Sequence, residues 1–158
     1  MAIVVVLLLA AVAVLVAARL GAFSGRLPDN LGLRDGRLKP PSKTPNSVSS
    51  QAGLWADHPQ REGAQIAALQ VQGGGPATLE RLARVIESMD GARIVERRSD
   101  YIYAQFTTKL MRFVDDAEFW FDPVAGVIQV RSASRVGRKD FGVNRARVEA
   151  IRARMAGT

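Results

Sequence analysis

The stretch EFWFDPVAGVIQVRSAS, residues 118–134, contains two apolar runs on either side of the four-residue segment PVAG. Aromatic and β-branched runs that flank a short Pro/Gly segment predict a β-hairpin. Because successive side chains of a strand point to opposite faces, Ile128 and Val130 are expected to face the core and Arg131 the other face. With the two strands paired across the turn, Glu118 lies beside Arg131, where a bidentate charged pair is expected on one sheet face.

Further strands and two helices are predicted around this hairpin. The strands are expected over residues 65–71, 93–97 and 101–107, where β-branched and aromatic residues are concentrated. An apolar stripe at helical spacing predicts a helix that starts at Pro76 and ends near Gly91. A second helix is expected from Asn144 to about Met155. The order predicts an α+β domain in which an antiparallel sheet of four to five strands carries two helices.

The N-terminus has the composition of a membrane span. Its first 18 residues carry no polar side chain. At about 1.5 Å per residue, a helix over residues 2–23 covers about 30 Å, enough to cross the hydrocarbon core of a bilayer. A cleaved signal peptide is the alternative, but it needs a basic N-terminal region and a shorter apolar stretch. Residues 1–23 are therefore predicted to be a retained, single-pass transmembrane helix that attaches the protein to a membrane.

Two further segments are expected after this anchor. Residues 24–62 are rich in Pro, Gly and Ser and predict an extended segment that lies along the domain or joins it to the anchor. Residues 63–158 are predicted to form the α+β globular domain. The chain has no cysteine, which excludes disulfides and thiolate metal sites, and its single histidine, His58, excludes imidazole-rich metal sites. No cofactor is predicted.

The net charge of +7 is unevenly spread along the chain. Residues 131–154 hold eight Lys or Arg and only two carboxylates. Such an excess can form an electropositive C-terminal surface, and the alternative is a solvated helix face. Held near a membrane, the surface fits an anionic lipid or a membrane-protein partner. Nucleic-acid binding is disfavoured, because Tyr101 and Tyr103 alternate with apolar residues as sheet aromatics do and a membrane tether restricts access.

A dense group of polar side chains in and after the hairpin is the candidate binding site. Its members are Glu118, Arg131, Ser132, Ser134, Arg135, Arg138, Lys139, Asn144 and Arg145. The last helix is expected to fold back over the second hairpin strand and bring Glu118, Arg131, Arg135 and Asn144 together, with Arg145 beside them.

Two carboxylates beside this group offer alternatives. Asp115 and Asp116 form an alternative metal or acid–base site with Glu118, although adjacent residues of a strand point apart. Two structural interpretations also stay open. In one, Asp115 and Asp116 make a turn and the nearby arginines pair with the carboxylates; in the other, Asn144 caps the last helix. No catalytic residue is assigned.

Several short motifs resemble one family. They are DNLG at 29–32, GRL at 36–38, PNSVSS at 45–50, FVDDAEF at 113–119, RSASRVG at 131–137, DFGVNR at 140–145 and RVE at 147–149. With them the chain resembles, over residues 27–155, the domain-of-unknown-function family 1499, which is found in bacteria and plant plastids. The resemblance brings no established activity. With its apolar N-terminus, the chain is expected in the bacterial inner membrane. Many similar sequences also carry an N-terminal hydrophobic segment, which supports the anchor.

The side of the membrane on which the domain lies stays open. Six basic residues follow the apolar run: Arg19, Arg26, Arg34, Arg37, Lys39 and Lys43. Positive-inside logic therefore favours the cytoplasm. Many similar sequences, however, carry two cysteines at the positions of Pro41 and Ser47. A disulfide between them would imply an oxidising compartment, the periplasm.

These observations favour a membrane-anchored, noncatalytic binding or assembly module with a basic C-terminal surface. One alternative is a hydrolase or metal-dependent enzyme that uses Asp115, Asp116 or Glu118. Another is a carrier of an apolar ligand held between sheet and helix. Converging carboxylates would favour the enzyme, a deep apolar cavity the carrier, and a filled core the module.

Overall fold

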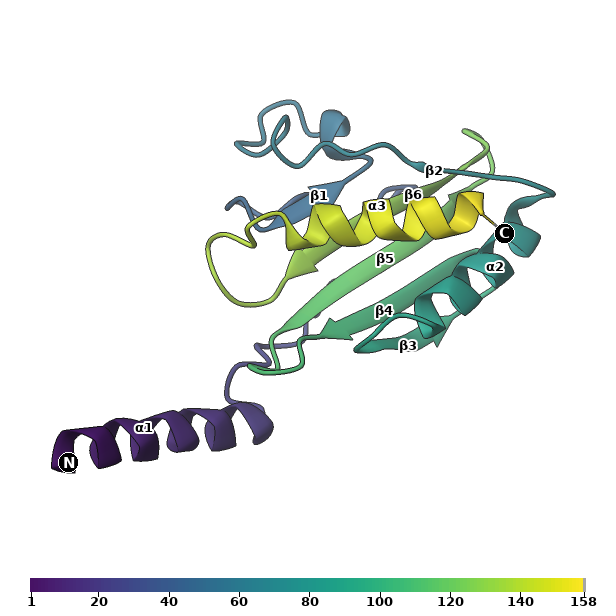
Figure 1. The fold of residues 1–158 in the computed structure, drawn as a ribbon. Helices are drawn as coiled ribbons and strands as arrows, with labels where there is room; N and C mark the ends of the chain where they lie inside the picture. Colours follow the sequence, from purple (N-terminus) through teal and green to yellow (C-terminus); the bar gives the residue numbers. More distant parts are fainter. Residues whose placement is uncertain (158) are drawn as a thin grey trace.

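The computed structural model describes residues 1–157, which form an N-terminal helix followed by an α+β domain (Figure 1). The helices are α1 (Ala2–Arg19), α2 (Gly75–Glu87) and α3 (Val143–Ala156), with one 3-10 turn, η1 (Ala52–Leu54). The strands are β1 (Ser47–Ser49), β2 (Leu69–Gln70), β3 (Ala92–Arg97), β4 (Tyr101–Thr107), β5 (Val114–Asp122) and β6 (Val127–Ser134). The predicted α+β class is confirmed, with six strands in place of the four to five expected.

The strands form one antiparallel sheet in the order β1-β6-β5-β4-β3, with β2 also pairing with β6. The β5–β6 hairpin has the predicted register, in which Glu118 pairs with Arg131. β1 and β2 pair with opposite ends of β6. Of the strand expected over residues 65–71, only β2 and a bridge at Gln65 form. The rest does not pair with β6, because β1 and Ser50, which bonds to Gln129 and Val130, occupy that part of its edge.

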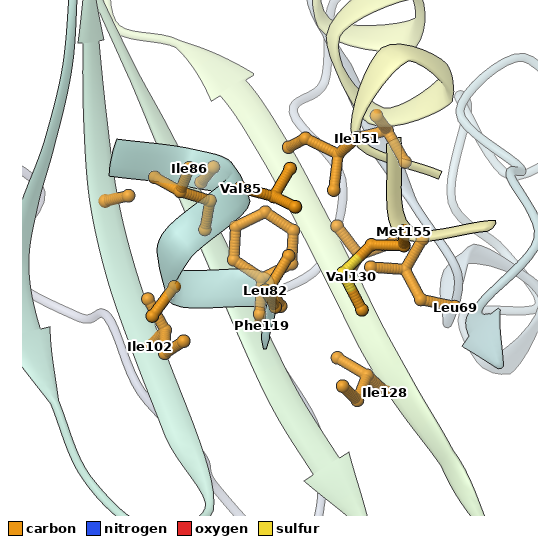
Figure 2. Close-up of a cluster of buried hydrophobic side chains, with 14 of the residues drawn as sticks. Leu69, Leu82, Val85, Ile86, Ile102, Phe119, Ile128, Val130, Ile151 and Met155 are labelled. Atoms are coloured by element: carbon orange, nitrogen blue, oxygen red, sulfur yellow. The ribbon is translucent and has the colours of Figure 1, made fainter. Parts of the chain in front are cut away.

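The helices α2 and α3 cover one face of the sheet (Figure 1). Leu82 and Ile86 of α2 and Ile151 of α3 are fully buried there, together with Phe119 and Val130 of the hairpin. Figure 2 shows these side chains gathered around the Phe119 ring. Burying such a side chain contributes about 1.5–3 kcal/mol, so this apolar layer is the main stabilising element of the domain.

The opposite face of the sheet is covered by the N-terminal segment, residues 26–46. Leu38 of this segment is buried against Tyr101 and Tyr103 of β4. The segment leads directly into β1, whose residues are all buried. Residues 26–46 therefore lie along the domain as one of its layers. Most of β4, β5 and β6 is buried on both faces, whereas β3 is largely exposed.

The first helix, α1, is different from the rest of the structure. It has 18 residues, a mean hydropathy of 2.8, and only 6% of it is buried against the domain. Its length and composition are those of a helix that can cross a membrane. In Figure 1 it projects away from the sheet.

Candidate functional site

The predicted site residues are divided between two faces of the sheet and the surface. The face under the N-terminal segment holds Glu118, Arg131 and Arg135; the helix face holds Ser132, Ser134 and Asn144; the surface holds Arg138, Lys139 and Arg145. Arg131 and Arg135 share a face, as predicted. The expected joining of these arginines with Asn144 is wrong, because strand alternation turns Ser132 and Ser134 toward α3.

Glu118 is the centre of a buried polar network beneath the N-terminal segment. Its Oε1 accepts hydrogen bonds from the Tyr101 hydroxyl at 2.8 Å and from the Gly32 N–H at 2.7 Å. Its Oε2 lies 3.8 Å from Arg131 Nη1 and accepts no hydrogen bond within residues 1–157. Arg131 Nε donates to the Pro40 carbonyl at 3.1 Å. The expected bidentate pair is therefore one long ionic contact. Burial lowers the pKa of Arg131, and the charge of Glu118 opposes this effect.

Asp116 and Arg135 form a second ion pair on the same face. Arg135 Nε and Nη2 donate to the two carboxylate oxygens at 2.8 and 2.7 Å, which is a bidentate arrangement. The Tyr103 hydroxyl donates to Asp116 Oδ1 at 2.5 Å and accepts from Gln105 at 2.8 Å. The hydrogen bonds to Asp116 raise the pKa of Arg135. Asp116 thus has a structural partner on each oxygen.

The stability of the domain is expected to fall between pH 10 and pH 12. Burial, with the hydrogen bond to Asp116, raises the pKa of Tyr103 from 10.0 to about 12. The folded state therefore keeps this proton when the unfolded chain has lost it, so the stabilisation is complete below pH 10 and is lost as the pH rises through about 12.

Denaturant unfolding of the full chain in detergent, repeated at rising pH, measures this loss. Tyr103→Phe should lose stability less steeply than the wild type. Some pH dependence should remain in that variant, because burial also raises the pKa of Tyr101. Identical pH profiles for wild type and variant would contradict the assignment.

Arg147 is the centre of a second buried network, between α3 and the sheet. It donates to Asp115, to Ser132 Oγ at 3.0 Å and to Asn144 Oδ1 at 2.6 Å. Its guanidinium carbon lies 4.6 Å from the centre of the Phe106 ring. The side chains of Arg147 and Asp115 are 9% and 6% exposed. Arg147 is not among the predicted site residues. Its position three residues after Asn144, on the same face of a helix, could have indicated that the two side chains lie together.

Asn144 is fully buried and joins α3 to the strands. Its amide donates to Ser134 Oγ at 3.0 Å, to the Asn46 carbonyl at 3.2 Å and to Asp140 Oδ2 at 2.9 Å. Asp140 also accepts from the backbone N–H groups of Gly142 and Asn144, at 3.1 Å each. Although burial opposes it, these hydrogen bonds lower the pKa of Asp140. The interpretation of Asn144 as the cap of α3 is wrong, because Gly142 precedes the helix and Asp140 supplies the acceptor.

The basic residues of 131–154 do not share one surface. Three arginines belong to the buried networks described above. Arg145 and Arg152, on α3, donate to backbone carbonyls that precede β2. Arg138 and Lys139 lie exposed in the loop between β6 and α3. Arg154, in the last turn of α3, is also exposed, so the exposed basic charge of this region is divided between that loop and α3.

The carboxylates considered as an acid–base pair do not converge. Asp115 and Asp116 lie inside β5, not in a turn, and face opposite sides of the sheet, each paired with an arginine. Among residues 1–157, no three His, Asp or Glu side chains are grouped as a metal site requires. On the helix face, the layer in which a carrier would hold a ligand is filled by packed side chains such as Phe119 (Figure 2). This geometry supports neither alternative function.

Comparison with known proteins identifies the family. A search of the curated proteins and a search of the solved structures gave no match. A family model, described as "Protein of unknown function (DUF1499)", matches residues 37–155. The matched region begins within the N-terminal segment, ends in α3 and includes both ion-pair networks. The chain therefore belongs to the DUF1499 family.

Proposed function

We propose that this chain is a single-pass, noncatalytic binding module whose domain rests on an anionic lipid surface. The observation that carries the proposal is the position of α1. The residues that follow α1 pack against two loops of the domain, and these loops expose apolar and basic side chains. The side on which the domain lies is proposed to be the cytoplasm, because basic residues follow α1.

Two contacts fix the end of the anchor beside the domain. The ring of Phe23 lies 5.8 Å from the ring of Phe113, in the loop between β4 and β5. Gly25 has a φ of +67° and packs against the start of the β6–α3 loop. A Cβ at Gly25 would lie 2.6 Å from the Cβ of Arg135 and 2.7 Å from a methyl of Val136, so only glycine fits here. Both loops are therefore held close to the point where α1 would leave the membrane.

Both loops lie on the side of the domain from which α1 projects (Figure 1). The β6–α3 loop carries Phe141, which is 94% exposed, together with Arg138 and Lys139. The β4–β5 loop carries Leu110, which is 62% exposed, and Arg112. We call these five residues the loop surface. Exposed aromatic and aliphatic side chains among Lys and Arg are typical of protein surfaces that lie in a membrane interface.

The expected energies are sufficient for docking. Each basic side chain of the loop surface contributes about 1 kcal/mol toward anionic lipid, and burial of Phe141 adds about 1.5–3 kcal/mol. Because α1 already holds the domain at the membrane, docking is an intramolecular event at high effective concentration. The basic side chains make the contact depend on anionic lipid, which is abundant in cytoplasmic leaflets.

The chain has no cysteine, so a single Phe141→Cys variant can carry an environment-sensitive fluorophore at the loop surface. The full chain is reconstituted into phosphatidylcholine vesicles with or without phosphatidylglycerol. We expect a blue shift of the emission when phosphatidylglycerol is present. Washing with alkaline carbonate should leave the protein in the vesicle pellet, because α1 spans the bilayer.

Val124→Cys is the matched control, because Val124 is 96% exposed and lies in the β5–β6 turn, at the opposite end of β6. Its fluorophore should not respond to lipid composition. Exchanging Arg138 and Lys139 for glutamine should reduce the response at position 141. Equal shifts at both labelled positions, or a response that ignores phosphatidylglycerol, would argue against docking. Release by carbonate would argue against the anchor.

A further inference from the structure

A basic pocket of about 630 Å³ lies between the N-terminal segment and the end of β6. The basic side chains in its lining are Arg26, Lys39, Lys43, Arg131 and Arg135. Within the described chain, the carboxylates of the lining are Asp29 and Asp116. Asp116 is held in its bidentate pair with Arg135, and Arg131 is paired with Glu118, which lies beneath the lining. Arg26, Lys39 and Lys43 therefore face Asp29 as the remaining carboxylate of the lining. The pocket therefore has an excess of positive charge.

Arg131 brings a buried guanidinium to this lining. Its side chain is 4% exposed, and its Nε is occupied by the Pro40 carbonyl. Its Nη1 approaches Glu118 at 3.8 Å, which is longer than a hydrogen bond. Within residues 1–157, the bond from Nε to the Pro40 carbonyl is the one hydrogen bond that the Arg131 side chain donates. A buried guanidinium with terminal N–H groups still to be satisfied is stabilised by an anion in the pocket.

Lys39 brings a second cation to the lining, close enough to Arg131 for the two charges to interact. Its ammonium group donates to Asn30 Oδ1. Burial and then the charge of Arg131 lower the pKa of Lys39, against the opposing charge of Asp29. An anion between Lys39 and Arg131 would favour the protonated lysine and reduce the repulsion between the two cations.

We propose that this pocket binds a phosphate group, carried by a soluble phosphate ester or by a lipid headgroup. With Arg131 paired to Glu118, three basic side chains against Asp29 leave an excess of two positive charges, which matches a dianion. Guanidinium and ammonium donors together supply charge-assisted hydrogen bonds. The volume leaves room for the group to which the phosphate is attached. Arg26 follows soon after α1, which ends at Arg19, so the pocket is close to the membrane. This inference does not depend on the loop surface.

The test uses the full chain in a neutral detergent at constant ionic strength, with isothermal titration calorimetry as the readout. One arm adds inorganic phosphate; the other adds mixed micelles with phosphatidic acid, and phosphatidylcholine micelles are the blank. Saturable binding is expected in at least one arm. Exchanging Lys39 and Lys43 together for glutamine should weaken it by about tenfold or more, because two charged contacts are lost. Arg131 is left unchanged, because its loss would destabilise the fold.

Two controls keep the pocket separate from other basic surfaces. Arg34→Gln removes an exposed basic side chain of the same segment that does not line the pocket, and the affinity should not change. In the phosphate arm, the exchange of Arg138 and Lys139 for glutamine should leave binding unchanged, because neither residue lines the pocket. In the phosphatidic acid arm every variant carries that exchange, so that binding by the loop surface does not contribute. Binding in the phosphate arm shows that the pocket takes the phosphate group without acyl chains, and binding in the phosphatidic acid arm alone identifies a lipid headgroup. No saturable binding in either arm, or binding that the Lys39 and Lys43 exchange leaves intact, would overturn the proposal.

Discussion

Replacing Arg131 by alanine is expected to destabilise the domain by about 3–5 kcal/mol, as is typical when one partner of a buried ion pair is removed. The side chains of Arg131 and Glu118 are 4% and 0% exposed, so the remaining carboxylate would be poorly hydrated. Glu118 would keep its hydrogen bonds from Tyr101 and Gly32, but its Oε2 would lose its nearest positive charge. The Pro40 carbonyl would also lose its donor.

Urea unfolding of the full chain in detergent measures this loss as a shift of the midpoint. Glu118→Gln, combined with Arg131→Ala, is the informative partner variant. The double variant buries no unpaired charge, so it should recover part of the stability, and the cycle gives the coupling between the two side chains. A loss below about 1 kcal/mol for Arg131→Ala would show that the site is open to water, as exposed ion pairs are.

The hairpin and the two covering helices follow from sequence patterns. In residues 118–134 the alternation of apolar and polar side chains fixes which residues face the helices, and the short turn fixes the register. The pairing of Glu118 with Arg131 is a direct consequence of that register. The alternation and the turn involve residues close together in the chain, so both can be recognised in a single sequence.

The layer formed by the N-terminal segment does not follow from such patterns. Residues 26–46 have neither helical nor strand periodicity, and the segment is held by contacts with residues distant in sequence, such as Leu38 with Tyr101. An indication was present in β4, whose sequence YIYAQFT is apolar or aromatic on both faces. A strand with two such faces is expected to be covered on both sides. The pocket could not be predicted from the sequence either, because only this layer brings Lys39 close to Arg131, which is distant in sequence.

The division of the predicted site residues between the two faces of the sheet is also not evident from the sequence. The residues from Asp115 to Asn144 look like one cluster when read along the chain. Alternation separates them, because Asp115 and Ser132 face α3, whereas Asp116 and Arg131 face the N-terminal segment. Two networks, each with its own arginines, are the result.

Replacing Arg147 by alanine is expected to destabilise the domain by about 3–5 kcal/mol through the network on the helix face. The change leaves the buried Asp115 carboxylate without its cation and removes donors to Ser132 and Asn144. It also removes the stacking of the guanidinium on the Phe106 ring. Because these partners lie on β4, β5, β6 and α3, one side chain holds the final helix to three strands.

Two further variants separate this network from a simple loss of charge. Arg147→Lys keeps the charge but lacks the planar fork that reaches three acceptors at once, so it should recover only part of the stability. Arg145→Ala removes an exposed arginine of the same helix, whose donors reach only surface carbonyls, and should cost less than about 1 kcal/mol. Urea unfolding of the three variants in detergent gives the comparison. If Arg147→Lys unfolds at the wild-type midpoint, charge alone is sufficient. If Arg145→Ala loses as much stability as Arg147→Ala, surface contacts hold the helix as strongly as the buried network does.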